Sequence, residues 1–528
     1  MRNRHFELAK QAFLQGKKGY MAMGRATNLV ISERFRTFAR MNTKKGNSLK
    51  EKTARGLLWG ALNNGAMQFI GLAFGILLGR MLNPDDYGFI SMITIFTVIA
   101  GALQESGFGK ALVNLDEPTD TDCNAVFWFN ILVGGACYVI LFLCAPLIAR
   151  YYHHPILVPL SRYAFLSILF SSFGIVQSAL LQKHLMVKQR SKANISAVLL
   201  SSSVGAIMAW RGFAYWSLAT QTNLYILLNT VFYWHYSPWR PSLKIDFSPI
   251  KRMFGFSFKV LATTIITQIN NNILNILLGR YFTARDTGNY NQAYQWNSKV
   301  VYLLQGMVNS VTQPVMVDLR SNLGRQQAAL RKLVRFTAFL SFPMVLGFGL
   351  VSREFILITL TAKWLTSASY LRILCIGGAF LPISTLFSEF ILSHGKSGTI
   401  FWCTLALFAT QLSAMLLAYP WGIQLMIWLI VAINIVWAFI WYALSSRLVS
   451  YSLWMFLADV MPFALAAAAV MALTWLITSP LSSPWLLLIS RIITAALLYY
   501  GLMKVARVKI LDECMNFLLK KHKGKDRA

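Results

Sequence analysis

Side-chain amides crowd one part of the sequence, between about residues 268 and 313, within segments that are otherwise long and apolar. They are Gln268, Asn270, Asn271, Asn272, Asn275, Asn289, Asn291, Gln292, Gln295, Asn297, Gln305, Asn309 and Gln313, with Tyr290, Tyr294, Trp296 and Tyr302 between them. Amides donate and accept hydrogen bonds and aromatic rings offer flat apolar faces, so this mixture suits a ring-shaped ligand with many hydroxyls. The alternative is hydrogen bonding between packed helices, worth about 0.6 kcal/mol per contact. The amides exceed what helix packing requires, which favours a water-filled groove.

Cations inside the same apolar segments add a second chemistry, because arginine forks and lysine ammoniums bind phosphate groups. Lys299, Arg372 and Arg491 fall within or near predicted spans, and Lys299 and Arg372 are the best candidates for cations in a cavity. Lys110, Lys259 and Arg335 lie nearer segment ends, where we expect their stems to follow the lipid and their charges to reach the headgroups. We therefore predict a binding site formed by Asn271, Asn275, Asn291, Gln295, Lys299 and Arg372.

Enzyme and metal chemistry find little support in the sequence. The six cysteines lack a CxxC pair and lie mostly in apolar segments, while His153 and His154 are adjacent in a short loop. No nucleophile–base or metal-ligand constellation stands out, so we predict no enzyme activity, no cofactor and no bound metal. Acidic residues in or near apolar segments are candidates to take up a proton or sodium ion, without one being favoured: Glu105, Glu354, Glu389 and Asp459.

The chain as a whole has the composition of a membrane protein. It is 56% hydrophobic and only 13% charged, whereas a soluble protein carries about 25% charged residues. About 20 apolar residues in a helix cross the ~30 Å hydrocarbon layer. We predict an all-α membrane protein with about fourteen spans near 57–79, 88–106, 124–149, 158–181, 194–211, 214–236, 254–279, 287–315, 334–358, 369–392, 399–418, 422–445, 455–477 and 484–504.

Basic residues outnumber acidic ones by 50 to 19, giving a net charge of +31. In a membrane protein this excess belongs to loops that stay cytoplasmic, so it does not indicate nucleic acid. The loops that follow the even-numbered spans are the basic ones, which predicts that both termini are cytoplasmic. Residues 1–55 contain 14 lysines and arginines against three acidic residues and no apolar signal core, so we expect a disordered basic extension rather than a secretory signal.

An internal repeat organises the spans. Leu78–Gly88 reads LGRMLNPDDYG and Leu278–Gly288 reads LGRYFTARDTG. The positions shared by the two copies are predicted to build the same turn: Gly79, Arg80, Asp86 and Gly88, then Gly279, Arg280, Asp286 and Gly288. Each copy joins the first two spans of a six-span block, so the blocks are parallel repeats, which suit an alternating-access transporter. We expect Arg80 and Arg280 to cap the repeated turn on the outer face of the membrane. The predicted parts are a lobe at 56–253, a second lobe at 254–450, two further spans at 451–505 and a basic tail at 506–528.

These segments resemble a known family. They are the repeat turn 78–88 and the stretches 105–113 (ESGFGKALV), 124–130 (NAVFWFN), 145–149 (APLIA), 179–182 (ALLQ) and 237–241 (SPWRP). From about residue 50 to 400 the chain resembles the polysaccharide transporters of the multidrug/oligosaccharidyl-lipid/polysaccharide exporter superfamily. The resemblance implies two six-helix lobes plus two C-terminal helices. It also implies transport of undecaprenyl-diphosphate-linked oligosaccharide to the periplasmic leaflet of a bacterial inner membrane, with membrane lipids and polysaccharide assembly proteins as partners. Residues 270–275 (NNNILN) lack charges that family members often carry there.

Three alternative functions remain open at this point. A peptidoglycan-precursor flippase also has fourteen spans, whereas drug exporters of the same superfamily usually have twelve. A polysaccharide polymerase or ligase would need a sizeable outer loop with paired arginines or acid/base residues, and every predicted loop is short. The sequence does not distinguish which glycan is carried or which ion drives the cycle.

Overall fold

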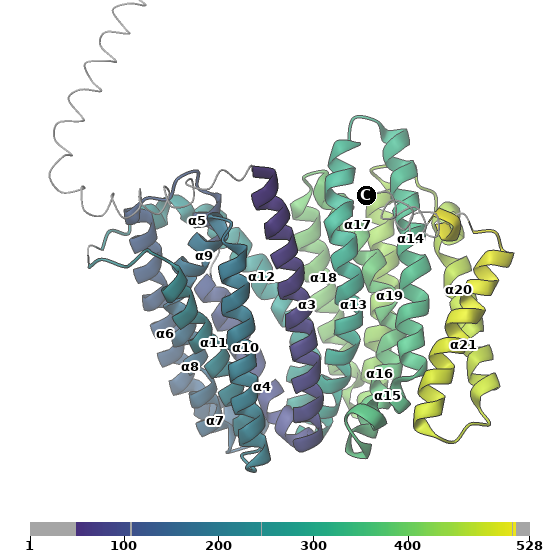
Figure 1. Ribbon diagram of the computed structural model, residues 1–528, viewed down its shortest axis with the longest axis horizontal. Helices are drawn as coiled ribbons and strands as arrows, with labels where there is room; N and C mark the ends of the chain where they lie inside the picture. Colours follow the sequence, from purple (N-terminus) through teal and green to yellow (C-terminus); the bar gives the residue numbers. More distant parts are fainter. Residues whose placement is uncertain (1–48, 106–107, 244, 509, 514–528) are drawn as a thin grey trace, which may run out of the picture.

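The computed structural model describes residues 49–105, 108–243, 245–508 and 510–513. In this part of the chain every regular element is a helix, and the long helices stand side by side (Figure 1). The predicted extension 1–55 and tail 506–528 lie largely outside the described residues, and the side chains of Glu105 and Lys259 are not described either.

The early helices are those before residue 240. They are α3 (Leu49–Met81), α4 (Pro84–Glu105), α5 (Phe108–Asn114), α6 (Asp120–Tyr152), α7 (Leu157–Ala164), α8 (Leu166–Ser172), α9 (Ile175–Lys183), α10 (Val187–Trp210) and α11 (Tyr215–Tyr236). The late helices are α12 (Ser248–Tyr281), α13 (Ala284–Asp318), α14 (Leu323–Leu350), α15 (Ser352–Thr359), η1 (Ala362–Trp364), α16 (Leu365–Gly378), α17 (Leu381–Ser393), α18 (Ser397–Ala418), η2 (Tyr419–Trp421), α19 (Ile423–Ser446), α20 (Leu453–Thr478) and α21 (Pro484–Val505).

Ten helical segments of the described chain are long and apolar enough to cross a membrane, and eleven if the bent pair α7–α8 and α9 is one span. The prediction of an all-helical, multi-pass membrane protein is therefore confirmed, while these criteria do not reproduce the count of fourteen. The long helices α11, α12 and α13 are not among the ten. α13 carries most of the amides noted above, and these lower its mean hydropathy.

Buried apolar side chains form one large cluster and three smaller ones. The large cluster contains only residues from Ile273 onward, including Phe456 on α20 and Tyr499 on α21. The smaller clusters contain, apart from Ala284, only residues up to Ile250. The early and late helices thus each have their own apolar core, and α20 and α21 pack on the late helices at the edge of the molecule (Figure 1).

Both copies of the repeated turn begin a helix with the same carboxylate. Asp286 accepts a hydrogen bond from the Thr283 amide while Thr283 Oγ1 accepts one from the Asp286 amide at 3.1 Å, which is a capping box. In the first copy, the Asn83 amide donates to Asp86 Oδ2 at 2.8 Å. The repeated aspartate thus satisfies backbone donors at the start of α4 and α13.

The two turns meet at one end of the molecule, which we call the turn end. A methyl group on Gly88 would lie 1.9 Å from the Ala284 carbonyl oxygen, and one on Gly288 would lie 1.8 Å from the Pro84 carbonyl oxygen. The first turns of α4 and α13 therefore cross in direct backbone contact, which only glycine permits. The turn end is closed in this structure.

Candidate functional site

A cavity of about 270 Å³, the amide pocket, lies between early and late helices near the turn end. Its walls come from α3, α4 and α11 on the early side and from α12 and α13 on the late side. Four of the six predicted site residues line it: Asn275, Asn291, Gln295 and Lys299. Long helices position them, because Asn291, Gln295 and Lys299 follow one another at intervals of four along α13 and so share one face.

Lys299 supplies the positive charge of the amide pocket. Its Nζ lies 4.0 Å from the centre of the Trp296 ring, within cation–π range. It also reaches the opposite wall, since a methyl group on Gly75 of α3 would lie 3.8 Å from Lys299 Nζ. No described carboxylate pairs with this ammonium. A buried amide oxygen without a partner, Asn275 Oδ1, lines the same cavity. The pocket therefore offers one cation and a buried amide oxygen that can accept a further hydrogen bond.

Asn271 and Arg372 are not part of this cavity. Asn271 is exposed on α12, one position before Asn272, which does line the pocket. Arg372 is exposed on α16 and lines a separate, almost wholly apolar groove with Leu350 and with Trp475 of α20. The structure does not bring Arg372 together with Lys299.

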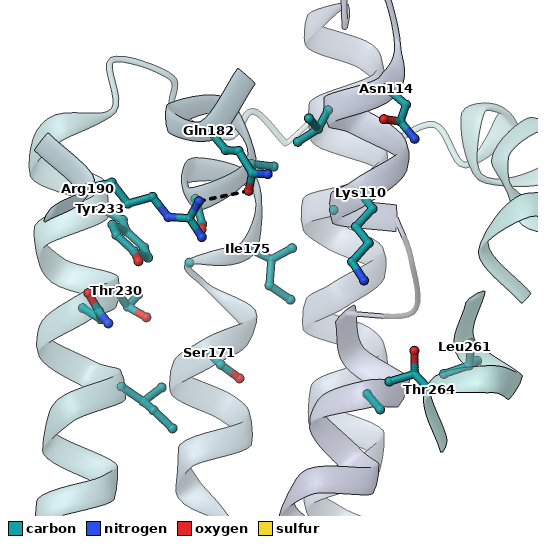
Figure 2. Close-up of a pocket in the computed structure, with 18 residues that line it drawn as sticks. Lys110, Asn114, Ser171, Ile175, Gln182, Arg190, Thr230, Tyr233, Leu261 and Thr264 are labelled. Carbon is teal, nitrogen blue, oxygen red and sulfur yellow. Dashed lines mark hydrogen bonds between the residues drawn. The ribbon is translucent and has the colours of Figure 1, made fainter. Parts of the chain in front are cut away.

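A larger cavity of about 620 Å³, the cationic pocket, lies between the early helices and α12 at the end opposite the turns. Lys110 on α5 and Arg190 on α10 point into it from different walls (Figure 2). Arg190 Nη1 donates a hydrogen bond to Gln182 Oε1 on α9 at 3.0 Å. Neither Lys110 nor Arg190 belongs to an ion pair of the described residues. Burial lowers the pKa of His184 in the adjoining turn, so that imidazole adds no charge here at neutral pH.

Sequence reasoning missed the cationic pocket. The sequence predicts that Lys110 extends toward lipid headgroups, and Arg190 lies in one of the basic loops that predict the orientation of the chain. The signal in the sequence was that both residues follow apolar segments ending on the same side of the membrane. Their separation of 80 positions hid the fact that α5 and α9 pack together and place α10 beside them (Figure 1).

Ion pairs with buried carboxylates attach α20 and α21 to the neighbouring helices α14 and α15. The Asp459 carboxylate of α20 is fully buried and accepts hydrogen bonds from Arg331 Nε at 2.7 Å and from Arg335, both on α14. Arg491 of α21 lies 2.7 Å from Glu354 of α15. Arg335 therefore does not extend to the headgroups as expected. Of the candidate coupling carboxylates, Asp459 and Glu354 serve these pairs, while Glu389 is in no ion pair of the described residues.

The repeated arginines hold the turn end closed. Arg80 Nε donates to the Thr359 carbonyl at 2.8 Å and its Nη2 to the Ile358 carbonyl at 2.6 Å, at the C-terminus of α15. Arg280 Nη1 donates to the Tyr151 carbonyl near the C-terminus of α6, and its guanidinium lies 5.0 Å from the Tyr151 ring centre. The hydrogen bonds of both arginines thus go to helix ends in the opposite half rather than to the repeated turn itself. Each satisfies terminal carbonyls of a helix in the other half, where a cation is favoured.

Two further contacts join the halves at this end. The Trp364 indole donates to the Gly79 carbonyl at 2.8 Å, and Lys363 Nζ donates to the Arg80 carbonyl at 2.7 Å. A methyl group on Gly79 would lie 2.5 Å from Leu360, and one on Gly279 would lie 2.7 Å from Met92. The repeated glycines are thus the sites at which early and late helices touch.

Sequence comparison identifies a protein family and several known proteins that the chain resembles. The profile of a family described as "Polysaccharide biosynthesis protein" matches residues 77–369. The chain is 26% identical to the teichuronic acid biosynthesis protein TuaB of Bacillus subtilis over 71% of its length and 80% of that protein. It is 23% identical to the lipopolysaccharide biosynthesis protein WzxC of Escherichia coli, covering 66% of this chain and 71% of WzxC. The succinoglycan biosynthesis transport protein ExoT of Rhizobium meliloti is 22% identical over 73% of the chain and 76% of ExoT.

Solved structures share the fold at low sequence identity. The lipid II flippase MurJ in an inward closed conformation superposes with a TM-score of 0.70 over 86% of this chain and all of MurJ, at 14% identity. An inward-facing multidrug resistance MATE transporter superposes with a TM-score of 0.59 over 72% of this chain and 94% of that chain, at 14% identity. The fold is therefore one that membrane transporters use.

Proposed function

The chain belongs to the polysaccharide biosynthesis protein family, and we propose that it is a flippase for undecaprenyl-diphosphate-linked oligosaccharide repeat units. It moves them from the cytoplasmic to the periplasmic leaflet of a bacterial inner membrane, for surface polysaccharide biosynthesis. Relatives named for teichuronic acid, lipopolysaccharide and succinoglycan biosynthesis support this substrate class. The transport step needs no covalent chemistry, only a path for a polar head group.

The amide pocket is the observation that carries the proposal. A hydroxyl or amide moved from water to an apolar medium without a partner costs roughly 2–7 kcal/mol. A sugar has several such groups, so it crosses the bilayer only where the protein replaces their water. Asn275, Asn291, Gln295 and Lys299 line one cavity with other amides and with Tyr294 and Trp296. These groups match sugar hydroxyls and ring faces.

In alternating access, the amide pocket opens first to one side of the membrane and then to the other. We propose two six-helix lobes, residues 56–253 and 254–450, followed by two helices at 451–505 and completing fourteen spans. Separate apolar cores and the repeated turns support this division. With both termini cytoplasmic, the closed turn end faces the periplasm and the cationic pocket faces the cytoplasm. The structure then corresponds to a state that loads substrate from inside.

Deleting the gene in a strain without paralogues tests the proposal. Lipid-linked repeat units should accumulate on the cytoplasmic leaflet and surface polysaccharide should disappear, and a plasmid copy should restore it. The fold similarity to the lipid II flippase defines a second arm, in which the gene is expressed during depletion of that flippase. We expect no rescue of peptidoglycan synthesis. Unchanged surface polysaccharide in the deletion strain would contradict the proposal.

A further inference from the structure

We propose that the cationic pocket is a diphosphate-binding site, separate from the amide pocket, where the head group of the substrate first docks. The inference rests on the proposed function for its substrate class, a polyprenyl diphosphate. Its position supports this role, because α5, α9 and the start of α10 lie at the end opposite the closed turns (Figure 1). In the proposed orientation this is the level of the cytoplasmic leaflet, where the lipid-linked sugar is made available.

The described residues that line the pocket include two cations and no carboxylate. The Lys110 ammonium has three N–H donors and the Arg190 guanidinium has five. One of the Arg190 donors, on Nη1, is used in the hydrogen bond to Gln182. No described carboxylate pairs with either cation. Two cations that face one cavity without a counter-charge repel each other, so an anion between them is favoured. A diphosphate supplies the acceptor oxygens that both cations require.

Extension toward lipid headgroups does not describe Lys110 in this structure. Its aliphatic stem descends from α5 and its ammonium points into the space between the helices, toward Thr264 and Leu261 of α12 (Figure 2). Arg190 is half-buried, and its guanidinium points inward from α10. Lys110 is exposed and Arg190 is half-buried, and both side chains point into the same open cavity.

The remaining lining fits a lipid-linked diphosphate. Asn229 is 9% exposed, lines the cavity and has an amide oxygen without a hydrogen-bond partner. Such an oxygen can accept a bond from a sugar hydroxyl next to the phosphates. Ile175, Ile226 and Leu261 supply an apolar wall. About 620 Å³ lies within the usual range for small-molecule sites and leaves room beyond a diphosphate for one sugar.

Binding measurements on the full-length chain in nanodiscs test the site. The probes are undecaprenyl diphosphate without sugar, in the bilayer, and inorganic pyrophosphate, in solution. The double variant Lys110→Gln/Arg190→Gln should bind at least tenfold more weakly than the parent. The charge-conserving variant Lys110→Arg/Arg190→Lys should retain most of the affinity, which separates lost charge from lost folding. Lys188→Gln is the matched control. Lys188 lies on α10 like Arg190, but its Nζ lies 5.6 Å from the centre of the Trp59 ring and it does not line the cationic pocket.

Each outcome bears on the proposal. Loss of lipid binding alone identifies the lipid-linked head group as the ligand, and loss of pyrophosphate binding as well shows that the diphosphate suffices. Equal affinities of the parent and the double variant for both probes overturn the site. The proposed function fails separately: a protein whose undecaprenyl diphosphate binding depends on Lys110 and Arg190, but whose deletion leaves surface polysaccharide unchanged, has the site without the transport role.

Discussion

Replacing Arg80 with glutamine should shift the protein toward a state that is open at the turn end. The guanidinium of Arg80, an early residue, holds the Thr359 and Ile358 carbonyls, which belong to the late helices. Glutamine is too short and uncharged to span both carbonyls. The closed state therefore loses these contacts, whereas a state with separated turns never had them, so the substitution favours opening.

The size of the shift follows from the contacts. A hydrogen bond to a charged group contributes about 1.5–3 kcal/mol when shielded, and about 1 kcal/mol is a fair value for each of the two bonds of the exposed Arg80. Losing about 2 kcal/mol raises the ratio of open to closed protein roughly 30-fold, since about 1.4 kcal/mol corresponds to tenfold. Arg280→Gln should act in the same direction through the Tyr151 carbonyl.

Thiol accessibility measures the opening. Ser91 of α4 is 3% exposed and lines the amide pocket, so Ser91→Cys in a cysteine-free background places a thiol behind the closed turns. A membrane-impermeant maleimide added to intact cells should modify it about 30-fold faster in the Arg80→Gln variant, in proportion to the open population. Arg211→Gln is the control, because Arg211 follows α10 near the same end and contacts Trp210 of its own helix. Equal rates in the Arg80 variant and this control would refute the assigned role.

Four further substitutions address the site and the fold. Lys299→Ala should abolish polysaccharide export at normal membrane abundance, whereas Arg372→Ala should leave export near the parental level, because only Lys299 lines the amide pocket; the reverse order would contradict the site. Asp459→Asn should lower the free energy of unfolding by about 2 kcal/mol. This is less than the roughly 3–5 kcal/mol lost when a fully buried ion pair is broken, because Arg331 and Arg335 are partly exposed. A melting temperature equal to the parent's would contradict a stabilising role for this ion pair. Gly288→Ala should prevent closure at Pro84 and abolish export, which transport assays on folded protein would show.

Much of the architecture followed from local chemistry in the sequence. Apolar stretches of bilayer length predicted a multi-pass helical protein, because a backbone in lipid must satisfy its own hydrogen bonds. The repeated Gly-Arg and Asp-x-Gly positions located the turns, and the sequence placed Asn291, Gln295 and Lys299 in one predicted span, where a spacing of four puts them on one face of α13. These features depend on residues close together in the chain, where helix geometry alone determines which side chains meet.

Tertiary structure decided which distant residues became partners. Arg372 and Lys299 were both predicted to be cations of one site, but helix packing places Arg372 beside α20 and away from the amide pocket. Lys110 and Arg190 face one cavity although 80 positions separate them. Arg80 and Arg280 bind carbonyls of the opposite half, because the crossing of α4 and α13 at Gly88 and Gly288 brings the halves into contact. Hydropathy and periodicity fix a side chain's depth and its face on a helix, whereas the neighbour on that face depends on how every other helix packs.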